Sequence, residues 1–308
     1  MKKYLWGIIY GLLLTAFTCY VLMDTFVITR VYTTIPSGDS GKLSVTDNNN
    51  GSDNSSSEQP DASSVVLTEN SYKDENISIT ITEYRENDTT IYVADVQLAS
   101  ADYLQTAFAQ NSYGKNITAK TSEIAGEHNA ILAINGDYYG AQEKGYVLRN
   151  GVLYRSTASS AQEDLVIYSD GSFEIITEKS ISADSLLTDG AQQILSFGPA
   201  LVVDGEISVT EEEEVGKAKT SNPRTAIGII DELHYVFIVS DGRTDESEGL
   251  SLYELAEFMQ SLGTTVAYNL DGGGSSTMVF NGEVINNPTT NGKSIKERSV
   301  SDIVYIGY

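Results

Sequence analysis

The stretch Tyr268–Phe280, "YNLDGGGSSTMVF", places an acid, three glycines and two serines between two apolar segments. A dinucleotide-binding turn requires its glycines to open a helix, and a P-loop requires Gly-Lys followed by Ser or Thr. Here the glycines lead into an apolar arm that turns back at Asn281-Gly282, a dipeptide typical of hairpins. The stretch therefore predicts a strand, a loop and a second strand, and it argues against both nucleotide-binding folds.

Strand patterns dominate the rest of the chain from residue 72 onward. "ISITITEY" and "TTIYVADVQLA" alternate apolar and polar residues and are separated by "REND", which predicts a hairpin. A helix is predicted over Ser251–Gly263, where Ser251 and Glu254 form a capping box, and shorter helices over Thr121–Asn129 and residues 182–191. Many strands with few helices predict an α+β domain around a mixed sheet.

Twenty uncharged residues lie between Lys3 and Asp24, enough for a helix that crosses a hydrocarbon core of ~30 Å. Lys2 and Lys3 precede them, so we expect a cytoplasmic N-terminus and an extracellular remainder. A cleaved signal peptide is the alternative, but its apolar region is normally shorter and ends in a small-x-small site, which is not obvious here. The pattern favours a signal-anchor that spans the cell membrane once.

Three regions follow from this organisation. Residues 1–30 form the cytoplasmic tip and the transmembrane helix, and residues 31–71 form a flexible linker rich in Ser, Asn and Asp. Residues 72–308 form the extracellular domain. The only cysteine, Cys19, lies in the apolar segment, so this domain is held together without disulfides.

Composition excludes several kinds of site. The net charge of −24 argues against nucleic acid as a partner, and an anionic ligand would have to be held by a few placed groups. The two histidines, His128 and His234, and the absence of exported cysteine argue against a zinc site. No cofactor is predicted, although Ca²⁺ or Mg²⁺ at the acidic loops stays open.

Three polar loops follow apolar strands. They carry Asn135 and Asp137, then Asp241 and Arg243, then Asp271. Each loop alone is typical of a turn. Strand ends of one sheet can converge, however, and two carboxylates about 5–9 Å apart are the machinery for hydrolysing a glycosidic bond.

The glycine-rich loop and two arginines suggest how an anion could be held. Successive backbone N–H groups in the loop can point into one concavity, with serine hydroxyls beside them. Arginine is suited to bidentate contact with phosphate. The alternatives are a glycine-rich bulge and ordinary surface arginines. The residues concerned are Gly272, Gly273, Gly274, Ser275, Ser276, Arg224 and Arg298.

Five motifs, in order, resemble the phosphodiester glycosidase family, which includes the lysosomal uncovering enzyme and bacterial exopolysaccharide biosynthesis proteins. They are "INGDYYG", "NPRTAIGI", "VSDGR", "NLDGGGSSTMV" and "RSVSDIVYI", and the resemblance covers residues 121–308. It implies hydrolysis of the C1–O bond of a sugar-1-phosphodiester, for example one of N-acetylglucosamine. The animal enzyme differs in having disulfides, extra modules and a C-terminal anchor, so the identity of the substrate does not transfer.

The resemblance also implies roles for single residues. Asp271, Asp137 and Asp241 match catalytic positions, and either Asp271 or Asp137 would stabilise an oxocarbenium-like transition state or activate water. Arg224 and the glycine-loop amides would stabilise the phosphate that leaves. The remaining substrate-binding or phosphate-binding positions are Asn135, Arg243, Arg298 and Gly272 to Ser276, and Ser301 and Asp302 belong to the last motif.

The resulting prediction is a membrane-anchored extracytoplasmic hydrolase of cell-envelope or exopolysaccharide metabolism, with a phosphoglycan or sugar-1-phosphodiester as its partner. Two alternatives stay open: a non-catalytic module that binds cell-wall glycopolymer, and an assembly factor. Which sugar is used, and which carboxylate acts as nucleophile or base, is open at this point.

Overall fold

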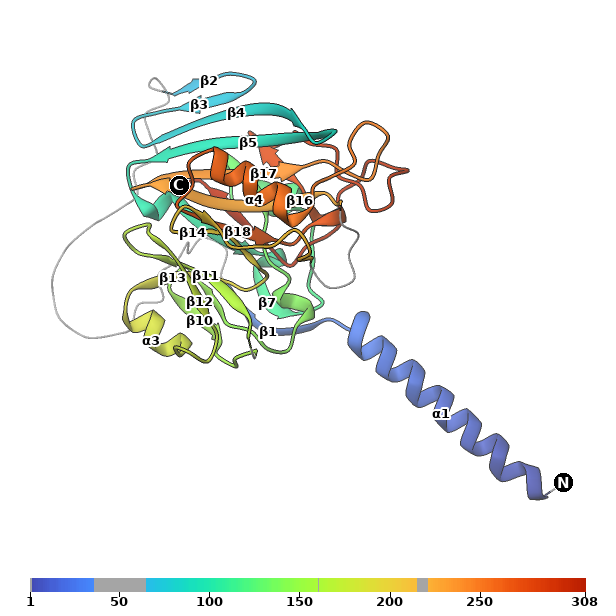
Figure 1. Cartoon of the computed structure of the whole chain (residues 1–308). Coiled ribbons are helices and arrows are strands. Elements are labelled where there is room, and N and C mark those ends of the chain that lie inside the picture. Colours follow the sequence, from blue (N-terminus) through green and yellow to red (C-terminus); the bar gives the residue numbers. More distant parts are fainter. Residues whose placement is uncertain (1, 36–64, 160, 215–220) are drawn as a thin grey trace.

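The computed structural model describes residues 2–35, 65–159, 161–214 and 221–308. In these residues a long apolar helix, α1 (Lys2–Phe26), projects away from a β-rich domain (Figure 1). Three further α-helices are found in the same described ranges, and they are α2 (Thr121–Glu127), α3 (Ala183–Thr188) and α4 (Leu252–Ser261). The α+β fold class is therefore confirmed.

The largest sheet has nine strands. In spatial order they are β15 (Glu206–Ile207), β14 (Ala200–Val203), β18 (Val266–Leu270), β16 (Arg224–Asp231), β17 (His234–Ser240), β5 (Thr89–Leu98), β4 (Ile77–Glu86), β3 (Ser71–Lys73) and β2 (Val66–Leu67). Neighbouring strands throughout this sheet run antiparallel. The large sheet is therefore antiparallel, whereas a mixed sheet was expected. Short turns, such as those of β4–β5 and β16–β17, join strands that are direct neighbours, and strands joined in this way run antiparallel.

Two further sheets of the domain have five strands each. One contains β20 (Glu283–Val284), β19 (Met278–Phe280), β8 (Leu132–Asn135), β21 (Asp302–Ile306) and β6 (Leu104–Phe108). The other contains β10 (Val152–Arg155), β9 (Val147–Arg149), β13 (Ala191–Leu195), β11 (Glu163–Tyr168) and β12 (Phe173–Thr177).

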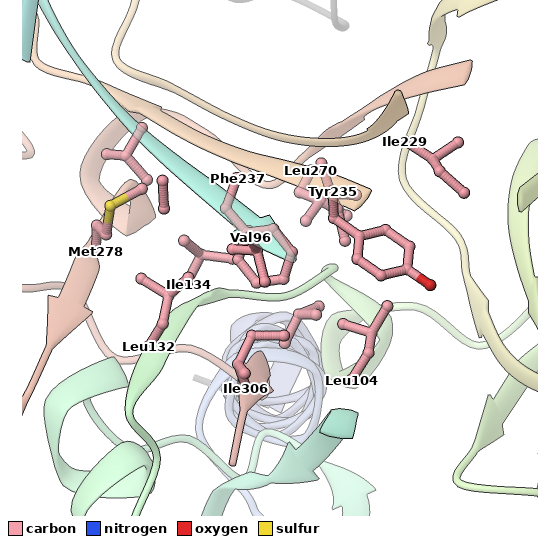
Figure 2. Packing of buried hydrophobic residues seen from close by; sticks show 14 of the residues in the cluster. Val96, Leu104, Leu132, Ile134, Ile229, Tyr235, Phe237, Leu270, Met278 and Ile306 are labelled. Atoms are coloured by element: carbon pink, nitrogen blue, oxygen red, sulfur yellow. The ribbon is translucent and has the colours of Figure 1, made fainter. Parts of the chain in front are cut away.

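The main core lies between these sheets. Val96, Phe237 and Leu270 of the large sheet belong to the same buried cluster as Ile134 and Ile306 of the first five-stranded sheet (Figure 2). The cause is the period-two alternation of the strands, which sends every second side chain to one face. A second cluster on the opposite face of the large sheet is covered by the apolar side of α4.

The predictions for α4 and for the stretch Tyr268–Phe280 are confirmed. Ser251 accepts a hydrogen bond from the backbone N–H of Glu254, whose side chain accepts from the N–H of Ser251, as expected for a capping box. β18 ends at Leu270, and after the short turn η4 (Gly273–Ser275) the chain enters β19, which pairs with β20 across Asn281-Gly282. β18 and β19 belong to different sheets, so the glycine loop bridges the two layers.

The boundaries of the predicted linker, residues 31–71, need correction. Residues 36–64 lie outside the described part of the chain. On either side of them the chain forms strands: β1 (Arg30–Thr34) pairs with β7 (Ser112–Lys115), and β2 and β3 extend the large sheet. The domain therefore begins immediately after α1, because the alternating "RVYTT" finds a partner strand some eighty residues further along the chain.

Candidate active site

Asn135, at the end of β8, connects three of the predicted motifs. Its side-chain amide donates to the carbonyl of Asp271 over 2.6 Å, and its Oδ1 accepts from Thr225 Oγ1 over 2.8 Å and from the N–H of Thr277 over 3.2 Å. Asn135 is completely buried. Its amide group therefore aligns the loops with one another, which differs from the expected role in direct contact with phosphate.

Asp271 follows β18 and pairs with a cation. Its Oδ2 lies 2.9 Å from the guanidinium of Arg298. Burial raises the pKa of Asp271 above its usual value, although the Arg298 charge works against this shift and the Asp137 charge adds to it. The side chain is mostly but not fully buried, with 14 % of it exposed. Asp271 thus combines an accessible edge with a perturbed carboxyl group, a combination typical of functional acids.

Arg298 closes the glycine loop from its outer side. Its Nε and one terminal nitrogen donate to Ser275 Oγ over 2.8 and 2.6 Å, and the same terminal nitrogen reaches the carbonyl of Gly272 over 3.3 Å. The Arg298 side chain is 42 % exposed. A ligand at the loop would therefore meet this guanidinium from the solvent side.

Arg243 lies close enough to Arg298 and Arg224 for their positive charges to affect its pKa. Burial lowers the pKa of Arg243, and the positive charges of Arg298 and Arg224 lower it further. Arg243 donates to the carbonyl of Thr290 over 2.7 Å and to Asn222 Oδ1 over 2.9 Å. Arg224 is buried, donates to the carbonyl of Leu250 and pairs with Glu214 over 2.7 Å. Arg243 thus lies within electrostatic reach of both other arginines, while Arg224 is engaged inside the protein with Leu250 and Glu214.

The glycine loop passes close to this cationic group. A Cβ atom at Gly273 would lie 2.8 Å from a terminal nitrogen of Arg243, so a larger residue there would displace the arginine. The N–H groups of Gly273, Ser275 and Ser276 donate to carbonyls of the protein. This differs from the predicted nest, in which the amides of the loop would point at a ligand. Ser276 Oγ is buried and has no hydrogen-bond partner among the described residues, and Gly274 packs against Thr290.

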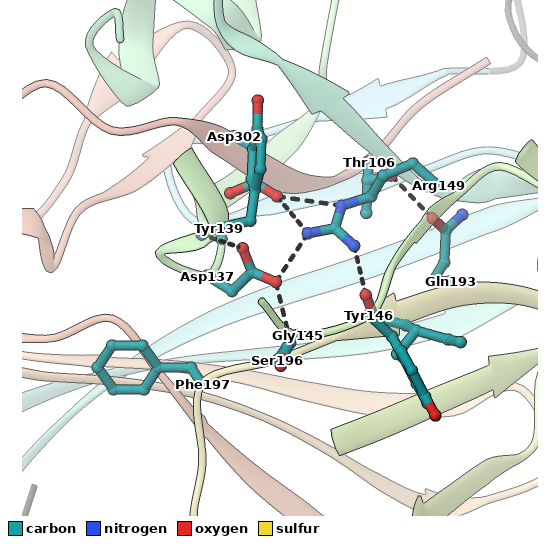
Figure 3. A network of polar contacts seen from close by, with 12 residues as sticks. Thr106, Asp137, Tyr139, Gly145, Tyr146, Arg149, Gln193, Ser196, Phe197 and Asp302 are labelled. Carbon is teal, nitrogen blue, oxygen red and sulfur yellow. Dashed lines mark hydrogen bonds and ion pairs between the residues drawn. The ribbon is translucent and has the colours of Figure 1, made fainter. Parts of the chain in front are cut away.

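Asp137 lies in a buried ionic network (Figure 3). The guanidinium of Arg149 contacts Asp137 Oδ2 over 2.8 Å and Asp302 Oδ2 over 2.7 Å. The N–H groups of Tyr139 and Ser196 also donate to the Asp137 carboxylate, each over 2.9 Å. These partners hold the Asp137 carboxylate inside the protein, and its catalytic role stays a prediction.

The network holds one cation and two acids inside the protein. Burial and the negative charge of Asp137 raise the pKa of Asp302 well above its usual value, while Arg149 opposes the shift. A proton on Asp302 leaves the network close to neutral, which is the cheaper state for buried charge. Sequence reasoning missed Arg149, since "YVLRNGVLYR" is typical of a hairpin with exposed arginines. The available signal was a charged residue within an apolar strand.

The carboxylate of Asp241, which follows β17, is also hydrogen bonded within the protein. Its carboxylate accepts from the backbone and side chain of Asn287 over 2.8 and 2.9 Å, and from Asn286 Nδ2 over 3.3 Å. Asp241 is buried and fixes the loop that follows β20. Sequence reasoning did not single out Asn286 or Asn287.

The arrangement separates the predicted site residues into two sets. Asp271, Arg298, Ser275 and Arg243 surround the glycine loop, while Asp137, Asp241 and Asn135 hold the loops beneath it. In the part of the chain that the structure describes, no cluster of three or more His, Cys, Asp or Glu is placed to hold a metal ion. The prediction concerning Ca²⁺ or Mg²⁺ stays a prediction.

The family model for phosphodiester glycosidases matches residues 128–307, which include every loop of this site. The chain belongs to the phosphodiester glycosidase family. The N-acetylglucosamine-1-phosphodiester alpha-N-acetylglucosaminidase of Mus musculus is 28 % identical to this phosphodiester glycosidase over 211 residues, 61 % of this chain and 40 % of that protein. The SPbeta prophage-derived uncharacterized protein YomE of Bacillus subtilis (strain 168) is 30 % identical over 190 residues, 60 % of this chain and 29 % of that protein.

Solved structures share the fold of this phosphodiester glycosidase. The catalytic domain of zebrafish N-acetylglucosamine-1-phosphodiester alpha-N-acetylglucosaminidase, auto-inhibited by its pro-peptide, superposes with a TM-score of 0.60 at 22 % identity and covers 75 % of this chain and 83 % of that one. A hypothetical protein from Synechocystis gives a TM-score of 0.52 at 16 % identity and covers 76 % of this chain and 62 % of that one. The chain spans less than half the length of the two curated relatives named above. Family membership therefore carries over, while their complete activities do not.

Proposed function

We propose that this phosphodiester glycosidase hydrolyses the C1–O bond of a sugar-1-phosphodiester, with N-acetylglucosamine as the model sugar. Water adds its hydroxyl to C1, the electron pair of the broken bond goes to the phosphate oxygen, and a phosphomonoester leaves. The proton of the water goes to Asp271 or to solvent. The observation that carries the proposal is Asp271 at the edge of a loop flanked by the guanidinium groups of Arg298 and Arg243.

The two parts of this arrangement suit the two ends of the breaking bond. An ionised Asp271 would stabilise positive charge at C1 or accept a proton from the attacking water. Arg298 and Arg243 would stabilise the negative charge of the departing phosphate, which requires little general acid catalysis. Arg298 lowers the pKa of the Asp271 carboxyl group and so favours its ionised form, in opposition to the effect of burial.

We also propose that the phosphodiester glycosidase acts outside a cell membrane, in the metabolism of envelope glycopolymers. The support is the segment Trp6–Phe26, 21 residues of mean hydropathy 1.8 whose side chains are not buried against the domain. The lysines before this segment favour a cytoplasmic N-terminus.

An Asp271→Asn variant tests the hydrolytic function. We expect release of free sugar from the methyl phosphodiester of N-acetylglucosamine to fall by at least about 100-fold, because the variant removes the charge needed at C1. Arg298 and Ser275 keep hydrogen-bonding partners, so the thermal unfolding midpoint should change little.

The matched control is Asp231→Asn, at the exposed far end of β16, which begins with Arg224. This control should keep full activity. Full activity in Asp271→Asn would refute the assignment. Binding of the ester without sugar release by the unaltered protein would instead favour the non-catalytic binding module.

A further inference from the structure

A short chain of contacts joins the end of α1 to the loop that carries Asp137. The side-chain amide of Asn116 donates to the carbonyls of Thr25 and Ile28 over 3.2 and 3.0 Å. The backbone N–H of Asn116 donates to the carbonyl of Gly140 over 3.1 Å. Gly140 lies in the turn η3 (Tyr139–Ala141), directly after the loop with Asp137. The helix terminus and the site are therefore linked through one asparagine.

β1 holds the domain to the same helix end. Its pairing with β7 runs from Arg30 opposite Lys115 to Thr34 opposite Ser112. Three residues, 27–29, separate α1 from β1. Three residues span at most about 10 Å when fully extended. If α1 crosses a bilayer, the β1–β7 side of the domain cannot move further than this from the membrane surface.

The side chains beside this junction suit a lipid interface. Val27, Val31 and Tyr32 are 64 %, 59 % and 58 % exposed. Exposed apolar side chains next to one another mark an interaction surface, and aromatic and aliphatic residues are favoured at the bilayer boundary. This patch continues directly from the apolar helix, so the lipid surface is its natural occupant.

The site itself borders this surface. Tyr139 stacks on Tyr113 of β7 with ring centroids 5.5 Å apart. Tyr138, between Asp137 and Tyr139, is 47 % exposed, although large aromatic side chains of the described domain are otherwise mostly buried. If α1 crosses a bilayer, this loop would lie close to the depth of the lipid head groups, since these extend only several Å beyond the hydrocarbon core.

From this placement we propose that the substrate is carried on a membrane lipid, as a sugar joined through one phosphate to a lipid alcohol. The inference rests on the proposed hydrolysis and on the proposed membrane anchor. Water would add to C1 and the C1–O bond would break, with its electron pair passing to the phosphate oxygen. The free sugar would leave into solution, the lipid phosphomonoester would stay in the bilayer, and the proton of the water would go to solvent.

The first experiment uses the full chain in vesicles of phosphatidylcholine and phosphatidylglycerol. Two probes are compared: the N-acetylglucosamine phosphodiester of a long-chain alcohol, embedded in the vesicles, and the corresponding methyl ester in solution. A 20-residue Gly/Ser insertion after Ile28 should lower cleavage of the embedded ester about tenfold, because a longer tether dilutes the domain at the surface. Cleavage of the methyl ester should stay the same.

The matched control carries the same insertion between Asn49 and Asn50. Both flanks of this region are held by the domain, through Ile35 on one side and β2 on the other, so the distance from α1 to the site does not change. This control should cleave both esters like the parent. Equal cleavage of the embedded ester by both insertion variants would overturn the lipid-borne substrate, whereas no cleavage of either ester by any form would refute the hydrolytic function itself.

A second measurement places the site without using activity. In a Cys19→Ser background, a fluorophore is attached to Lys144→Cys, in the loop after η3, or to Glu75→Cys, between β3 and β4 at the end of the domain far from α1 (Figure 1). Nitroxide-labelled lipids should quench the fluorophore at position 144 several-fold more than that at position 75. Equal quenching, or none at either position, would overturn the proposed placement at the membrane.

Discussion

A single buried arginine holds the two acids beneath the site. One terminal nitrogen of Arg149 donates to both Asp137 and Asp302. The other terminal nitrogen donates to the carbonyls of Leu148 and Ile194. Burying a charged group is favourable only when it is paired and fully hydrogen bonded. The stability of this region therefore depends on Arg149 more strongly than on either acid alone.

Arg149→Met tests this dependence. The variant leaves two buried carboxyl groups without their cation, so we expect the free energy of unfolding to fall by about 3–5 kcal/mol. Urea unfolding followed by circular dichroism measures the change. Arg85→Met is the control, since Arg85 is exposed on β4 and its loss should cost less than about 1 kcal/mol. A loss no larger than that of the control would show that the network is not important for stability.

A second buried acid pair lies next to this network. Neither oxygen of Asp164 has a hydrogen-bond partner among the described residues, while Glu178 accepts from the N–H groups of Tyr146 and Ser159. Burial and the negative charge of Glu178 raise the pKa of Asp164 to about 9. Ser196 and Asp137 also face this carboxyl group. Asp164 thus carries a proton at neutral pH.

The pH dependence of stability follows from this proton. The folded protein keeps it up to about pH 9, whereas the unfolded chain releases it near the ordinary value of 3.8. Between these values the folded state binds more protons, so stability falls as pH rises, by up to about 1.4 kcal/mol per pH unit. Asp164→Asn should remove this part of the slope in unfolding experiments at several pH values. An unchanged slope would mean that Asp164 is ionised in the folded protein.

The motifs predicted three acids for the candidate site, but they did not indicate the surroundings of each one. Asp137, Asp241 and Asp271 each follow an apolar strand, and this pattern is the same whether the side chain faces solvent or the interior. Their roles differ because of partners that are distant in sequence, such as Arg149 for Asp137 and Asn287 for Asp241. Only the three-dimensional arrangement distinguishes Asp271 as the acid with an accessible edge.

Among the elements, the loop after β20 positions one of the site arginines. The carbonyl of Thr290 accepts from Arg243 over 2.7 Å. Gly292 has a φ of +74°, and a Cβ atom there would lie 2.0 Å from the carbonyl oxygen of Arg243. The loop can therefore pack against the backbone of Arg243 only because residue 292 has no side chain.

Gly292→Ala should displace this loop and reduce sugar release at least about tenfold, because small shifts of positioning groups are costly. The control is Gly282→Ala in the β19–β20 turn, where φ is +80° but no atom lies within 4 Å of the added Cβ. Both variants carry the backbone strain of about 1–2 kcal/mol. If the two variants lose activity equally, strain and not the contact with Arg243 explains the loss.

Local sequence signals were sufficient to predict individual helices, strands and turns, but not to predict which strands pair with one another. The capping box of α4 and the Asn281-Gly282 turn were predictable, because each depends on residues a few positions apart. The assignment of β18 and β19 to different sheets was not predictable, since alternation within a strand does not specify which strand pairs with it.

For the whole molecule, the linker boundary was misplaced because a local sequence pattern does not show which distant strand a segment pairs with. The composition of residues 31–71 is polar on average, yet the first four of these residues belong to β1, which pairs with β7. Their inclusion in the domain changes the expected geometry at the membrane. If α1 crosses a bilayer, a long spacer would let the domain diffuse freely above it, whereas the three-residue junction would fix which side of the domain faces it.

The glycine loop between β18 and β19 has a mechanical consequence for the molecule. Because its two ends belong to opposite layers of the domain, the separation of the layers sets how far the loop is stretched. Asp271 lies near one end of this span and Ser276 near the other. Any breathing of the two layers, for example on heating, is transmitted to the spacing of these groups while the strands themselves stay paired.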